Sequence, residues 1–97
     1  MRDLKTIASI FDKYDNEVYN FDKIENKLHS KREIHAILLL DNLFPDDNQF
    51  DSCDKDYLLL GISIDNIKKL TDGNILELAR CGIYLDLEYK LLRIIII

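Results

Sequence analysis

The residues best suited to chemistry lie in one acidic segment near the middle of the chain. Residues 41–56, called the acidic segment below, hold six aspartates and one lysine. Their formal charge of −5 equals the net charge of the whole 97-residue chain, so the remainder is neutral on balance. Aromatic residues lie within and beside the aspartates. The candidate partner-binding residues are Phe44, Asp46, Asp47, Phe50, Asp51, Asp54, Asp56 and Tyr57.

Calcium binding and acid–base catalysis are the first chemistries to test for this segment. A helix–loop–helix calcium loop needs oxygen ligands at its first, third and fifth positions and a glycine at its sixth. Counting from Asp46 puts Phe50 fifth, counting from Asp54 puts Leu58 fifth, and the segment has no glycine. A general acid needs a desolvated carboxyl group, which a hydrophilic segment does not provide. The spacing therefore predicts neither a metal site nor catalysis here.

The remaining reactive side chains are scattered. His29 and His35 are six positions apart, on different sides of any helix, and Cys53 and Cys81 each lack a second nearby sulfur. The three glycines are too far apart for a phosphate-binding loop. We expect His35 to be a hydrogen-bonded core residue and Cys81 to be a small core hydrophobe. The pattern predicts no enzyme, no cofactor and no catalytic residue.

Apolar periodicity predicts that the first half of the chain is helical. Helices are expected at about residues 3–14, 20–29 and 31–44. Ser30 and Glu33 have the spacing of a capping box at the start of the third helix, which favours helix over a buried strand there. That helix is apolar on most sides, so we expect it to be central.

The second half changes to a strand pattern after the acidic segment. Strands are expected at about residues 57–64, 83–87 and 91–97, and short helices at 65–70 and 72–81. Asp65 and Thr71 are the expected caps of the two helices, and Gly82 is expected to end the second. The last strand is so apolar that it should be covered on both faces or form an interface.

The totals favour one α+β domain spanning residues 1–97, with the N-terminal helices packed on a small antiparallel sheet. A sequence pI near 4.9 argues against nucleic-acid binding, because neutralising phosphates needs clustered Lys and Arg. No apolar run is long enough to span a bilayer, and no secretory signal precedes the cysteines. We expect a cytoplasmic protein with reduced thiols and no membrane contact. Its oligomeric state is open.

The C-terminal third resembles a known class of bacterial proteins. From Gly61 the sequence reads GISIDNIKKLTDGNILELARCGIYLDLEYKLL, with Leu78–Tyr84 as its most distinctive piece. The order of strand, Asp, short helix, Leu-Thr, helix, Arg-Cys-Gly, Tyr and hairpin is similar to that of immunity proteins encoded beside polymorphic or contact-dependent growth-inhibition toxins. The resemblance implies a cytosolic protein that binds its cognate toxin C-terminal domain and blocks the toxin's active site. Such toxins are often nucleases with basic clefts, for which an acidic segment is a plausible phosphate mimic.

The first functional hypothesis is therefore a stoichiometric inhibitor that uses the aspartates for steering and the aromatic residues as anchors. A solvated segment without a partner is the plainer interpretation of the same charge run. A second hypothesis is a self-assembling structural or adaptor subunit that pairs through residues 91–97. A third is a phage-type inhibitor of a host nucleic-acid-binding enzyme.

Overall fold

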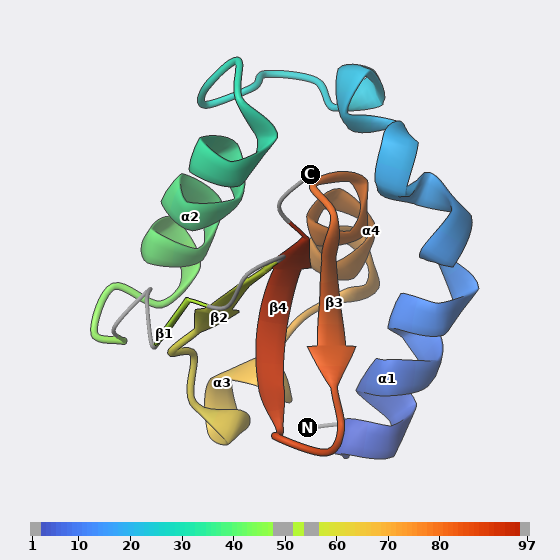
Figure 1. The fold of residues 1–97 in the computed structure, drawn as a ribbon, viewed down its shortest axis with the longest axis vertical. Coiled ribbons are helices and arrows are strands. Elements are labelled where there is room, and N and C mark those ends of the chain that lie inside the picture. Colours follow the sequence, from blue (N-terminus) through green and yellow to red (C-terminus); the bar gives the residue numbers. More distant parts are fainter. Residues whose placement is uncertain (1–2, 48–51, 54–56, 96–97) are drawn as a thin grey trace.

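The computed structural model describes residues 3–47, 52–53 and 57–95, and it has the expected α+β architecture (Figure 1). Helices and strands follow one another in the order α1 (Leu4–Lys13), η1 (Asp15–Tyr19), η2 (Phe21–Lys23), α2 (Arg32–Leu43), β1 (Ser52–Cys53), β2 (Tyr57–Leu60), α3 (Ile64–Ile67), α4 (Asp72–Arg80), β3 (Ile83–Asp86) and β4 (Leu91–Ile95), where η denotes a 3₁₀ helix.

The strands form one antiparallel sheet in the order β1-β2-β4-β3. The last strand, β4, is central: Leu92 faces Leu60 of β2 on one side and Leu85 of β3 on the other. The predicted hairpin at residues 83–97 is confirmed through residue 95. The predicted strand at 57–64 is shorter, since it ends at Leu60, and β1, which lies inside the acidic segment, was not predicted.

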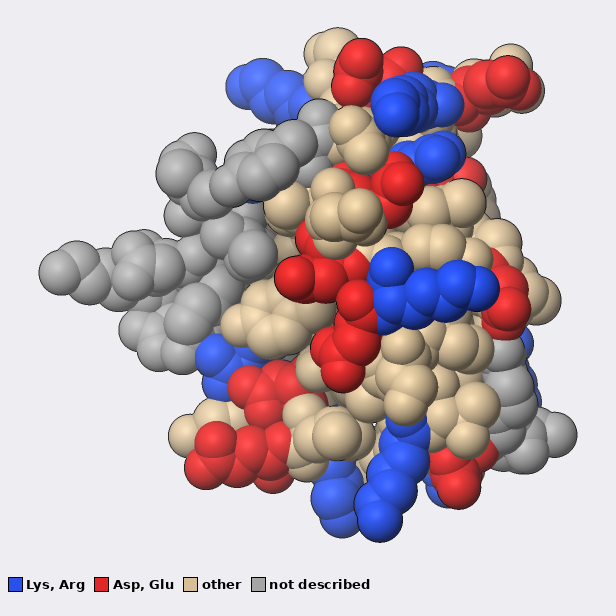
Figure 2. Space-filling model, turned by 90° about the vertical axis from the view of Figure 1, so that its right-hand side faces the viewer, with Lys and Arg blue, Asp and Glu red and all other residues tan. Residues whose placement is uncertain are grey.

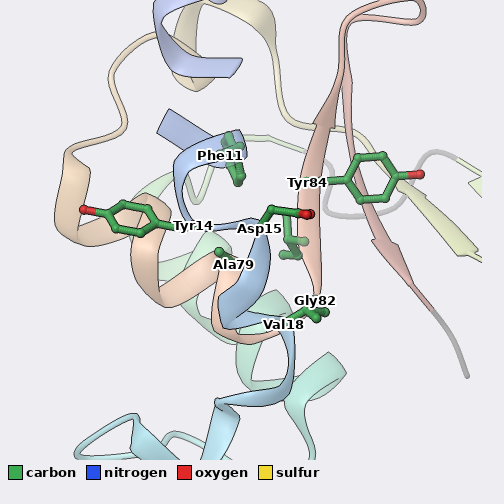
Figure 3. A pocket seen from close by; sticks show the side chains of 8 residues that line it. Phe11, Tyr14, Asp15, Val18, Ala79, Gly82 and Tyr84 are labelled. Carbon is green, nitrogen blue, oxygen red and sulfur yellow. The ribbon is translucent and has the colours of Figure 1, made fainter. Parts of the chain in front are cut away.

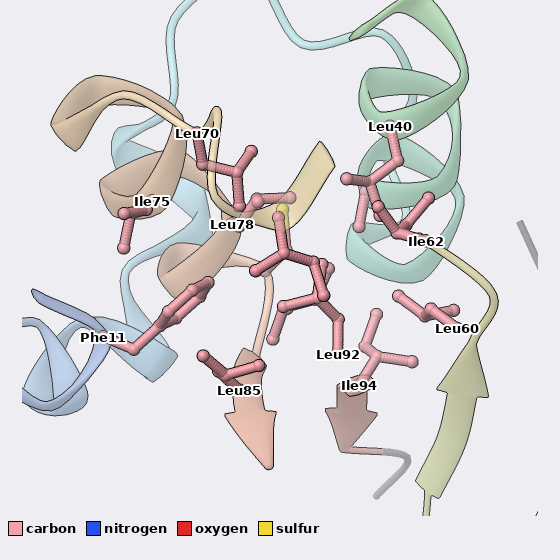
Figure 4. Packing of buried hydrophobic residues seen from close by; sticks show 14 of the residues in the cluster. Phe11, Leu40, Leu60, Ile62, Leu70, Ile75, Leu78, Leu85, Leu92 and Ile94 are labelled. Atoms are coloured by element: carbon pink, nitrogen blue, oxygen red, sulfur yellow. The ribbon is translucent and has the colours of Figure 1, made fainter. Parts of the chain in front are cut away.

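The core lies between the sheet and the helices that cover one of its faces. Figure 1 shows α4 behind β3 and β4, with α1 and α2 at opposite sides. Leu92 and Ile94 of β4 are fully buried, as their alternation in the strand requires. Figure 4 shows them packed with residues from all the surrounding elements: Phe11, Leu40, Leu60, Ile62, Leu70, Ile75, Leu78 and Leu85.

Helix boundaries follow local capping chemistry where the predictions succeeded. The Asp3 carboxylate accepts a hydrogen bond from Thr6 N–H at the start of α1. Thr71 and Asn74 form a reciprocal capping box at the start of α4. Gly82 ends that helix with φ +84°, a conformation that other residues adopt only with strain. These three signals are local, so the sequence alone could place them.

The helix predicted at residues 20–29 is wrong. The chain forms the short turns η1 and η2 instead, and no helix covers residues 24–31. In a helix, Leu28 N–H would donate to the Ile24 carbonyl. Here Leu28 N–H donates to His35 Nδ1 at 3.0 Å, while the Ile24 carbonyl accepts from Lys27 Nζ at 2.9 Å. Hydrogen bonds to side chains have replaced the helical backbone bonds, and Asn26 adopts φ +53°.

Three further predictions about helices fail. No capping box forms at Ser30, because α2 begins one residue later with Lys31 as its N-cap and no side-chain cap. The short helix predicted at 65–70 lies at 64–67 and is capped by Ser63 rather than Asp65. Helix α2 is not central: it lies at one side of the molecule (Figure 1).

Candidate partner-binding surface

The start of the acidic segment is fixed to the fold through Asp47. Its Oδ2 atom accepts hydrogen bonds from Ser63 N–H at 3.0 Å and from the Asn66 side-chain amide at 2.9 Å. Hydrogen bonds from Asn66 and Ser63 lower the pKa of the Asp47 carboxyl below its usual value. The predicted site residue Asp47 therefore ties the end of α2 to the start of α3. Its neighbour Asp46 is exposed.

The other predicted site residues are placed unevenly. Phe44 is partly buried and packs against the core. The backbone of Tyr57 begins β2, where it faces Ile95 of β4. Four predicted residues lie outside the part of the chain that the structure describes: Phe50, Asp51, Asp54 and Asp56. The structure thus places Phe44, Asp46 and Asp47 together after α2 and leaves the rest of the predicted site untested.

Helix α2 presents an apolar side that was not predicted as part of a site. Its buried residues are His35, Ala36 and Leu40, whereas Ile34 and Leu38 are each 38% exposed. The available signal was a helix apolar on most sides. Because the core covers only one side of such a helix at the margin of a domain, the opposite side remains in contact with solvent.

His35 is the most enclosed polar side chain near this helix. It is 1% exposed, and both ring nitrogens are used: Nδ1 accepts from Leu28 N–H and Nε2 lies 2.9 Å from Glu77 Oε2. Since Nδ1 is the acceptor, the neutral ring carries its proton on Nε2 and donates it to Glu77. The edge of the ring packs against Phe21. The prediction of a hydrogen-bonded core histidine is confirmed, and the pair joins α2 to α4.

Two of the hollows formed by the described residues lie near α4. One, of about 60 Å³, is bordered by α1, η1 and β3 (Figure 3), and the Tyr14 and Tyr84 rings point to opposite sides of it, so their hydroxyl groups do not converge. The other is open and polar, about 290 Å³, and is lined by both acidic and basic side chains: Lys23, Ile24, Glu25, Gly73, Leu76, Glu77 and Arg80. Arg80 lies 3.0 Å from Glu17, an ion pair that joins η1 to α4. Neither hollow favours one ligand charge.

The face of the sheet opposite α4 carries a buried arginine. Arg93 of β4 lies between Leu59 and Tyr84 in the strand register and is 7% exposed. Its Nε atom lies 2.8 Å from Asp86 Oδ2, and its guanidinium lies over the Tyr89 ring. A neighbouring carboxylate and an aromatic ring are the usual partners of a desolvated guanidinium. Arg93 therefore stabilises the β3–β4 hairpin.

Cys81 is a fully buried thiol, as predicted. Burial, with a smaller contribution from the nearby Glu77 charge, raises its pKa to about 12. A thiol that remains protonated is a poor nucleophile and metal ligand. Within the described residues, no group of three side chains is arranged to hold a metal ion.

Charge is evenly mixed on the side of the molecule where α1 lies. Figure 2 shows basic and acidic side chains next to one another on this face, with no large area of one sign. Interspersed charges of this kind produce little net field.

Among the described helices, none is long and apolar enough to cross a membrane. Searches against known protein families, curated proteins and solved structures found no match for this chain.

Proposed function

We propose that this chain is an immunity protein that binds a cognate toxin domain through the acidic segment and covers the toxin's active site in the cytosol. The observation that carries the proposal is the concentration of the entire net charge in residues 41–56. Negative charge concentrated in one segment attracts a basic surface and orients the approaching partner. A nuclease-type toxin, whose cleft binds phosphate, offers such a surface.

Asp47 supports the proposal because it gives the beginning of the segment a defined position. The two hydrogen bonds from Ser63 and Asn66 hold the beginning of the segment against α3. A preorganised binding segment loses less conformational entropy on association than a free one. Asp46, exposed beside this fixed point, is available to a partner.

The self-assembly alternative is less well supported. Over residues 91–95, β4 is paired with β2 on one side and β3 on the other. Edge pairing with a second copy through these residues would require one of the two ladders to open. The phage-type inhibitor shares the acidic chemistry of the main proposal and differs only in its target, so the neighbouring genes distinguish the two.

The test uses the C-terminal domain of the toxin encoded directly upstream of this chain's gene, purified with an inactivating substitution. Association rates are measured over a series of salt concentrations. Replacing Asp46, Asp51 and Asp54 together by lysine should slow association at low salt by at least about tenfold and flatten the salt dependence.

A matched control changes the net charge equally at a distance from the segment. Asp12, Asp15 and Glu88 are exposed on α1, η1 and the β3–β4 turn, and their replacement by lysine should have a much smaller effect. If both triple variants slow association equally, the net charge of the whole chain governs the association rate and the acidic segment has no special role. A wild-type chain that does not bind this domain would refute the immunity proposal for it.

A further inference from the structure

The exposed side of α2 combines apolar and acidic residues in one line. Ile34 and Leu38 are four positions apart and Asp41 follows three positions later, so all three lie along the same side of the helix. We call these three residues the α2 stripe. Ile34 and Leu38 retain 38% of their surface in water, and Asp41 is exposed. Other exposed apolar residues, such as Leu87 in the β3–β4 turn, lie elsewhere in the sequence.

We infer that the α2 stripe is the apolar part of the toxin-binding surface and that it binds in a groove on a basic protein. The inference rests on the proposed function, since it names where that interface obtains its apolar contacts. Helices that bind in grooves use anchors at positions i and i+4, which is the spacing of Ile34 and Leu38. The committed partner is a protein with an apolar groove bordered by Lys or Arg.

Charge complementarity is the argument for a basic partner. Asp41 lies in the last turn of α2, a turn that contains no basic residue. A carboxylate near a helix C-terminus opposes the helix dipole and is unfavourable there. Asp41 therefore does not stabilise its own helix, whereas a Lys or Arg side chain on a partner would pair favourably with its carboxylate. Asp41 is both the last residue of the α2 stripe and the first residue of the acidic segment.

Continuity with the acidic segment is the second argument. The segment leaves α2 directly, through Phe44 and Pro45, and Asp47 then fixes it against α3. Asp46 therefore lies just beyond the C-terminal end of the α2 stripe, on the side of the molecule where α2 lies (Figure 1). Phe44 packs against the core, whereas Ile34 and Leu38 are each 38% exposed. An interface that combines apolar anchors with surrounding charge matches the usual anatomy of protein complexes.

The test measures binding of the same inactivated toxin domain to an Ile34→Gln/Leu38→Gln double variant, which leaves the net charge unchanged. We expect its affinity to fall by at least about 30-fold, because hot-spot residues typically contribute this much. The loss should be in the dissociation rate, with the salt dependence of association retained, because lost apolar contacts do not alter steering. Leu87→Gln, at another exposed apolar residue, is the control and should bind like the wild type.

Each outcome decides between the alternatives. If the double variant binds the toxin domain with wild-type affinity, the α2 stripe is not part of the interface. That result overturns the inference and leaves the proposed function unaffected. No binding by the wild type overturns the proposed function and the α2 stripe with it. A wild-type dimer that light scattering shows to separate in the double variant means that a second copy occupies the stripe, which also overturns the inference. The milder Leu38→Gln variant, checked for an unchanged urea midpoint, separates lost binding from lost folding.

Discussion

The His35–Glu77 pair allows the most direct test of the physical reasoning. Its imidazole uses one nitrogen for the Leu28 backbone and the other for the Glu77 carboxylate, and it is 1% exposed. The amide oxygen of asparagine can approximate the position of Nδ1, and the amide nitrogen of glutamine can approximate that of Nε2. His35→Asn should therefore retain the Leu28 hydrogen bond, whereas His35→Gln should retain the Glu77 hydrogen bond.

The expected magnitudes follow from the number of bonds lost. A typical intramolecular hydrogen bond contributes about 1 kcal/mol, and leaving a buried partner unsatisfied costs about 1–3 kcal/mol. The 35% exposure of the Glu77 side chain allows water to replace part of that bond. We expect His35→Asn to reduce the free energy of unfolding by about 1 kcal/mol and His35→Gln by about 1–2 kcal/mol. His35→Ala loses both bonds and leaves a cavity, so about 3–4 kcal/mol is expected.

Urea denaturation of a double-mutant cycle isolates the pair. In the cycle of His35→Ala and Glu77→Ala, the coupling free energy should be about 1 kcal/mol. In the cycle of His35→Gln and Glu77→Ala it should be near zero, because glutamine retains the hydrogen bond to Glu77. Nitrogen chemical shifts of the imidazole should independently report a proton on Nε2. A coupling within about 0.3 kcal/mol of zero, or a ring protonated only on Nδ1, would show that the contact does not stabilise the fold as argued.

Three other predictions concern single positions. Asp47→Asn should lower the urea midpoint at neutral pH, and the difference from the wild type should disappear at low pH. The Asp47 carboxyl has a lower pKa in the folded chain than in the unfolded chain, where its pKa is about 3.9. The charged carboxylate therefore stabilises the fold fully above the unfolded-state pKa, and this stability is lost as pH falls through the folded-state pKa. Gly82→Ala should reduce the free energy of unfolding by about 1–2 kcal/mol because of its positive φ. Gly73→Ala should not be destabilising, because its added Cβ would lie 3.8 Å from Thr71 Oγ1, an ordinary contact distance. Equal urea midpoints for the two variants would contradict this. In a Cys53→Ser background, Cys81 should react with iodoacetamide far more slowly in the folded chain than in urea, because burial raises its pKa to about 12; equal rates would mean that the thiol is accessible.

Local signals in the sequence were sufficient for part of the candidate site and much of the fold. The placement of α4 needed only Thr71 and Gly82, because both act on backbone groups within a few residues. The hairpin was predicted from the alternation of residues 83–87 and the apolar run of residues 91–97, and both patterns are local. The charge of residues 41–56 is a property of composition, so the acidic surface hypothesis came from the sequence without any structure.

The tertiary structure decided what depends on distant partners. Residues 20–29 satisfy a helical pattern, yet Leu28 N–H donates to His35 Nδ1 and not to a backbone carbonyl one turn earlier. Asp47 could not be distinguished from Asp46 by sequence, since its partners Ser63 and Asn66 follow more than a dozen residues later. The exposed side of α2 was hidden for the same reason: periodicity shows that a helix is apolar, but only the packing of the whole chain determines which side is buried. Short-range hydrogen bonding is encoded locally, whereas burial depends on the whole fold.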